Sequence, residues 1–143
     1  MKKLIISACL LGEPCRYDGK SKPCDSMENL KKEYSLIPVC PECMGGLPTP
    51  RPPAEIQADG RVVNREGRDV TAEYRKGAEA VLEIARREDC HIALLKEKSP
   101  SCGKGRIYDG SFTGTLTEGN GVCVDLLIAN GIKVLGESEV EKL

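Results

Sequence analysis

The chain has no tryptophan, one phenylalanine and one histidine among its 143 residues. So few aromatic side chains cannot form the stacking platforms on which single-stranded nucleic acids bind. The chain also lacks an excess of charge, since 21 basic residues face 22 acidic ones. It has no run near the roughly 20 apolar residues of a membrane span. We therefore expect neither a large nucleic acid nor a membrane as a partner.

Cysteine, in contrast, is abundant, with eight residues. The first residues, MKKLIISAC, imitate a lipoprotein signal, but only Leu4 to Ala8 precede Cys9. That stretch is shorter than the roughly 7–15 apolar residues of a signal core. We therefore expect a cytoplasmic protein with reduced thiols, in which many cysteines indicate metal or sulfur chemistry.

The apolar and turn-forming residues predict one α/β domain over residues 1–143. Buried strands are expected where short apolar runs occur, and helices where apolar residues recur every three to four positions. The expected strands are 3–8, 36–39, 91–96 and 132–135; the expected helices begin at Asp25 or Ser26, run from Asp69 or Thr71 to about 89, and span 117–130. Asp59-Gly60 predicts a β-hairpin inserted at 56–63. This order predicts a small doubly wound, mostly parallel sheet of the Rossmann or flavodoxin-like kind.

Three cysteines come just after three of the expected strands: Cys9, Cys40 and Cys102. The carboxyl ends of parallel strands converge on one crevice, which is where open α/β sheets bind ligands. Three thiolates there suit a metal or an iron–sulfur cluster with one coordination position left for a substrate.

Other interpretations of the cysteines stay open. Cys40 and Cys43 form a Cys-x-x-Cys pair, but a redox pair needs its first thiol at a helix N-terminus, and the glycines and prolines after Met44 predict no helix there. Cys15 and Cys24 would complete a four-thiolate zinc site with that pair. His91, Cys90 and Cys123 are expected to be packed. Arg51 and a helix starting near Thr117 offer anion contacts, although ordinary loop and surface roles are favoured for both.

Taken together, the motifs SACLLGEPCRYDG, PVCPECMGGLPTPRPP, LLKEKSPSCG and IYDGSFTG resemble the thiouracil desulfidase family, from Met1 to about Glu137. The resemblance implies a 4Fe–4S cluster held by Cys9, Cys40 and Cys102, with one iron open. It implies Glu42 and either Ser99 or Ser101, with Ser99 preferred, as the catalytic pair. The implied reaction removes sulfur from a small thiolated pyrimidine, either thiouracil or a thiouridine nucleotide, giving uracil and sulfide. Cys43 departs from the family pattern.

Overall fold

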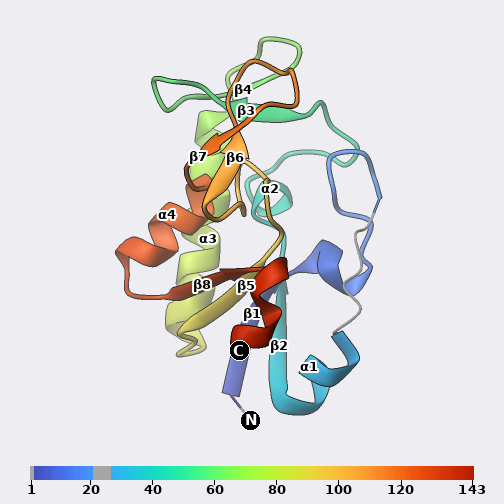
Figure 1. The fold of residues 1–143 in the computed structure, drawn as a ribbon, viewed down its shortest axis with the longest axis vertical. Coiled ribbons are helices and arrows are strands. Elements are labelled where there is room, and N and C mark those ends of the chain that lie inside the picture. The colour runs from blue at the N-terminus through green and yellow to red at the C-terminus, as the bar shows by residue number, and fades with distance from the viewer. Residues whose placement is uncertain (1, 21–26) are drawn as a thin grey trace.

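The computed structural model describes residues 2–20 and 27–143 (Figure 1). Its central sheet has four parallel strands in the order β2-β1-β5-β8. The bounds of these strands are Tyr34–Val39, Lys2–Ser7, Ile92–Leu95 and Lys133–Gly136. The predicted α/β class with a mostly parallel sheet is confirmed. The finer assignment to a Rossmann or flavodoxin-like fold stays a prediction.

Helical segments cover both faces of the sheet. Helices α3 (Thr71–Arg87) and α4 (Val122–Ala129) pack on the face to which Ile5 of β1 contributes. The opposite face, with Leu4 and Ile6, packs against three short segments: α1 (Met27–Glu33), η1 (Ala8–Leu11) and η2 (Glu137–Lys142). Because successive side chains of a strand point to opposite faces, a sheet covered on both sides requires the continuous apolar run seen in β1.

The order in which the strands are added to the sheet reverses at β1. From β1 the chain moves outward to β2, then returns across β1 to β5 and continues to β8. The carboxyl ends of β1 and β5 therefore lie at the point where the strand order switches, which is the usual ligand position in such sheets. None of the helices in the described ranges is long and apolar enough to cross a membrane.

Two small hairpins stand beyond these carboxyl ends, at the top of Figure 1. One pairs β3 (Ala54–Ile56) with β4 (Val62–Asn64), as the Asp-Gly signal predicts. The other pairs β6 (Arg106–Tyr108) with β7 (Leu116–Glu118) and was not predicted. The expected helix 117–130 was wrong at its start, since α4 begins only at Val122. Threonines favour the extended strand here, and the glycines that follow separate it from the helix.

Other sequence predictions about the helices agree more closely with the structure. Helix α3 has the predicted inward residues, and Gly131 (φ 80°) follows α4 in the predicted left-handed conformation. Tyr34, expected on the face of the first helix, is instead the first residue of β2. The expected helix start at Asp25 or Ser26 lies outside the described residues.

The segment after Cys40 was expected to contain no helix, but α2 (Pro41–Met44) forms one turn there. Pro41 is its first residue, the position where a missing N–H and a fixed φ are compatible with a helix. The later prolines lie beyond the turn and do not interfere with it. This turn carries Glu42 and Cys43.

Helix α2 packs on α3 with their backbones in direct contact, because the two residues at the crossing are glycines. A Cβ atom on Gly77 would overlap the carbonyl oxygen of Pro41, and one on Gly45 would overlap the carbonyl oxygen of Glu73. The position of α2, and therefore of Cys40 and Glu42, depends on this close approach.

We predict that Gly77→Ala lowers the free energy of unfolding by about 2 kcal/mol or more, because overpacking separates the two helices. Alanine normally stabilises a helix relative to glycine by roughly 0.5–1 kcal/mol, so the expected sign is opposite to that of helix propensity. Urea unfolding followed by circular dichroism measures the change. The neighbouring exposed control, Lys76→Ala, should stay within about 0.5 kcal/mol. A Gly77→Ala protein as stable as the control would contradict the packing argument.

Candidate functional site

A cavity of about 450 Å³ lies at the carboxyl ends of the sheet strands. Cys9, Cys40 and Cys102 all line it, from the segments that follow β1, β2 and β5. The two hairpins supply further lining residues, among them Glu55, Arg65 and Phe112. The cavity thus brings the three cysteines singled out in the sequence to one place, although they are far apart along the chain.

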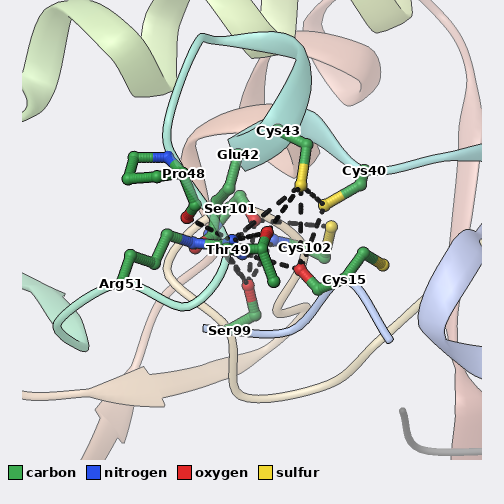
Figure 2. Close-up of polar contacts among 10 residues, drawn as sticks. All are labelled: Cys15, Cys40, Glu42, Cys43, Pro48, Thr49, Arg51, Ser99, Ser101 and Cys102. Atoms are coloured by element: carbon green, nitrogen blue, oxygen red, sulfur yellow. Dashed lines mark hydrogen bonds and ion pairs between the residues drawn. The ribbon is translucent and has the colours of Figure 1, made fainter. Parts of the chain in front are cut away.

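Glu42 points toward the two serines of the Ser99-Pro100-Ser101 segment. The hydroxyl of Ser101 donates to Glu42 Oε2 at 2.9 Å, and that of Ser99 lies 3.4 Å from the same oxygen (Figure 2). The two serine oxygens are 2.9 Å apart. Ser101 is 1% exposed, whereas Ser99 is half-buried at the cavity. The site therefore contains a carboxylate joined to a pair of hydroxyl groups.

The loop that carries these serines is fixed by its own backbone. The Ser99 hydroxyl oxygen accepts the N–H groups of Ser101 and Cys102, each at 3.1 Å. In return, the carbonyl oxygens of Pro100 and Ser101 accept N–H groups from the first turn of α4. Those N–H groups have no partner within their own helix, so the loop caps α4. They are not available to an anion, which agrees with the ordinary loop role favoured from the sequence for this helix start.

Arg51 holds the other oxygen of Glu42. Its Nε donates to Glu42 Oε1 at 3.0 Å, and its terminal nitrogens donate to the carbonyl oxygens of Pro48 (3.1 Å) and Cys15 (3.0 Å) and to the Thr49 hydroxyl (2.9 Å). The arginine side chain is 4% exposed. Arg51 had been considered as an anion contact, but its donors are occupied by the protein. No signal beyond its flanking prolines pointed to this role.

Burial controls the protonation of the three cysteines. Desolvation raises the pKa of Cys9 to about 11 and the pKa of Cys102 to about 12, and it raises the pKa of Cys40 as well. Hydrogen bonds from Ser101 and Ser7 partly oppose the rise in the pKa of Cys102. Ser7, at the end of β1, also accepts the N–H of Lys96 at 2.9 Å, and no sequence motif predicted either contact of Ser7. Without a bound cation these cysteines are neutral thiols at pH 7.

Cys40 and Cys43 are in contact, with their sulfur atoms 3.3 Å apart. No helix was expected after Cys40, which disfavoured a redox pair; that expectation was wrong, because α2 starts there. The single turn does not activate the thiol, however, since burial raises the pKa of Cys40. The carbonyl oxygen of Cys15 lies 3.7 Å from the Cys40 sulfur and 3.8 Å from the Cys43 sulfur. Cys24, the fourth member of the expected zinc site, lies outside the described residues.

The remaining predicted positions lie away from the cavity. Cys90 and Cys123 are buried in the core, as expected. His91 was expected to be packed, but its side chain is 77% exposed and contacts Asp89. Among residues 2–20 and 27–143, no three His, Cys, Asp or Glu side chains lie close enough together to hold a single metal ion.

Comparisons with known proteins agree with one another. A family model described as 2-thiouracil desulfurase matches residues 4–139. The uncharacterized protein YbbK of Bacillus subtilis (strain 168) is 37% identical over 149 aligned positions, which cover 98% of this chain and 99% of that protein. The solved structure of the 4Fe–4S-dependent thiouracil desulfidase TudS is similar with a TM-score of 0.94 and 48% identity, covering 100% of this chain and 95% of that one.

We predict that Arg51→Ala lowers the free energy of unfolding by about 3 kcal/mol, because Glu42 is left partly buried without its counter-charge. Arg51→Lys should recover only part of the loss, since an ammonium group cannot reproduce the forked set of donors. Urea unfolding of preparations with the same metal content measures both changes. The control is Arg75→Ala, an exposed arginine on α3. An equal effect of Arg51→Ala and Arg75→Ala would show that the Glu42–Arg51 pair does not stabilise the site.

Proposed function

Because this chain belongs to the 2-thiouracil desulfurase family, we propose that it is an enzyme that removes sulfur from thiolated uracil. The reaction exchanges a C=S bond for a C=O bond: water supplies the oxygen, sulfur leaves as sulfide, and no electrons are gained or lost overall. The observation that carries the proposal is the cavity that three cysteines, two of them buried and one half-buried, share with a carboxylate and two hydroxyl groups. A small planar base is the class of substrate that such a cavity suits.

We propose that Cys9, Cys40 and Cys102 hold a 4Fe–4S cluster, the cofactor on which the similar desulfidase TudS depends. The donor set supports this assignment. Thiolates are the ligands of iron–sulfur clusters, and each cysteine binds a different iron. Three cysteines can therefore share a cluster without gathering around the single point that one metal ion requires. Bound through three cysteines, the cluster supplies an open iron as a soft Lewis acid for the sulfur of the substrate.

Four residues that line the cavity then activate water, orient the carboxylate and hold the base. Glu42 accepts the proton of the water molecule that adds to the ring carbon carrying the sulfur. Arg51 pairs with the carboxylate and fixes its orientation through Oε1, which leaves Oε2 toward the serines. Ser101, almost fully buried, positions Glu42. Ser99, which is open to the cavity, holds the polar edge of the base with its hydroxyl group.

One observation favours a second candidate function. The contact between the Cys40 and Cys43 sulfurs is short enough for a dithiol or for a shared zinc ion. A zinc-stabilised or sulfur-carrier domain using this pair would need no substrate at Glu42. Metal content separates the two functions, because zinc without iron supports only the second.

We predict that the chain purified without oxygen is brown and contains about four irons and four sulfides, the composition of a 4Fe–4S cluster. Cys9→Ala, Cys40→Ala and Cys102→Ala should each lose the iron and the colour, because three thiolates are the minimum set. Cys43→Ala is the matched control in the same motif and should keep both. Metal analysis and absorbance measure the result. Loss of iron from Cys43→Ala as complete as that from Cys40→Ala would show that the ligand assignment is wrong.

We predict that Glu42→Gln lowers kcat for 2-thiouracil by about 10²–10⁴-fold while the iron content stays unchanged, because an amide cannot accept the proton. Ser99→Ala should lower kcat more than Ser101→Ala does. Sulfide release gives the rates, and Glu83→Gln, an exposed carboxylate on α3, is the control. A larger loss with Ser101→Ala would exchange the roles of the two serines. Wild-type rates for Glu42→Gln would remove Glu42 from the mechanism.

A further inference from the structure

The only phenylalanine of the chain, Phe112, has a backbone conformation that bulky side chains rarely adopt. It lies at the tip of the β6–β7 hairpin with φ 58°, in the left-handed region. For a residue of this size such a φ is an outlier, and strain of this kind clusters at sites that bind ligands. A glycine or an asparagine would satisfy the same turn at a lower cost. The backbone alone therefore does not explain why the residue is phenylalanine.

The strained tip is held in place by a buried carboxylate from the other hairpin. Oε1 of Glu55, on β3, accepts the N–H groups of Gly110 (3.0 Å) and Phe112 (3.2 Å). Glu55 is 8% exposed. Gln57 adds a contact from its side-chain nitrogen to the carbonyl oxygen of Gly110 at 3.3 Å. Hydrogen bonds to a charged acceptor are stronger than those between neutral groups, so Glu55 offsets the strain at Phe112.

The same arrangement places the Phe112 ring at the cavity. Phe112 is half-buried and lines the cavity that also contains Glu42, Ser99 and Cys102. The guanidinium carbon of Arg65 lies 5.9 Å from the centre of the ring. This is a cation–π distance, and the contact restrains the ring. The result is an apolar, planar surface fixed at the wall of the cavity that also holds the polar groups of Glu42 and Ser99.

We propose that Phe112 is the platform on which the pyrimidine ring of the substrate stacks, and that Glu55 is the residue that positions it. This inference rests on the proposed function, because it concerns a flat thiolated base in the same cavity. Glu42 and Ser99 engage atoms at the edge of such a base, which leaves its two faces without a contact. An aromatic side chain can stack on a face of the base, and such stacking does not depend on which ring carbon carries the sulfur.

The test compares variants in the cluster-loaded enzyme by turnover of 2-thiouracil and by equilibrium dialysis of labelled uracil, the product, which the enzyme does not consume. Stacking of a base on an aromatic side chain is worth about 5- to 150-fold in affinity. Phe112→Leu should raise KM for 2-thiouracil and Kd for uracil within that range, with kcat changed by less than about threefold. Phe112→Tyr should retain wild-type values. Thr113→Ala, in the same loop but not lining the cavity, is the matched control.

Two further variants separate stacking from a structural role. Phe112→Gly removes the ring and the backbone strain together, so Kd should rise while Tm falls no lower than that of the wild type. Glu55→Ala should raise KM in the same way as Phe112→Leu, and Glu55→Gln, which keeps an oxygen acceptor, should restore part of the loss. A fall in Tm for Phe112→Gly with unchanged Kd would make Phe112 a packing residue and overturn the proposal.

The outcomes distinguish this proposal from the proposed function. If the wild type releases sulfide and Phe112→Leu binds uracil as tightly as the wild type, the stacking proposal is wrong and the proposed desulfuration stands. If the wild type binds uracil but releases no sulfide, the chemistry is wrong, and the Kd values of the variants still decide whether Phe112 stacks. If the wild type neither binds uracil nor releases sulfide, both proposals fall. A Kd for uracil in Phe112→Tyr as high as that in Phe112→Leu would also exclude stacking.

Discussion

The rest of the site depends on the contacts of the Glu42 carboxylate with Arg51 and with the two serines. One oxygen binds Arg51, and the other faces Ser99 and Ser101. Through these contacts α2, the proline-rich segment and the loop after β5 are joined at a single side chain. Each partner is itself fixed: Arg51 by two carbonyl oxygens and a hydroxyl, and the serine loop by the first turn of α4. Removal of either partner would leave charge or polar groups buried without hydrogen bonds, which is costly.

The parts of the structure that could be predicted are those set by local patterns. The buried strand at Leu4 to Ile6 follows from an apolar run, the inward face of α3 from its periodicity, and the hairpin at Asp59-Gly60 from turn chemistry. The meeting of Cys9, Cys40 and Cys102 followed from a general rule about parallel strands. The family motifs named Glu42 and the two serines, but they said nothing about the geometry that joins them.

What could not be predicted depends on contacts between distant segments. Pro41 permits one helical turn, but that turn lies where it does because Gly45 and Gly77 let two backbones touch. Arg51 carries no local mark of its partners, which come from Cys15, Glu42 and Pro48. Helix α4 starts at Val122 rather than at the predicted residue 117, because the segment before it pairs as β7 and the loop at Ser101 caps the helix. In each case a tertiary contact decided between two local structures that the sequence permits.

The burial of the cysteines sets the relation between fold and cofactor. Their strands are joined by backbone pairing, and both faces of the sheet are covered by helices, so the fold brings the thiols to one cavity. In the metal-free chain they are neutral, since desolvation raises the pKa of Cys9, Cys40 and Cys102. Binding of the proposed cluster would therefore release protons from these thiols. The proposed cluster would then depend on the pairing of these strands for its ligands, unlike the metal of a zinc finger, on which the fold itself depends.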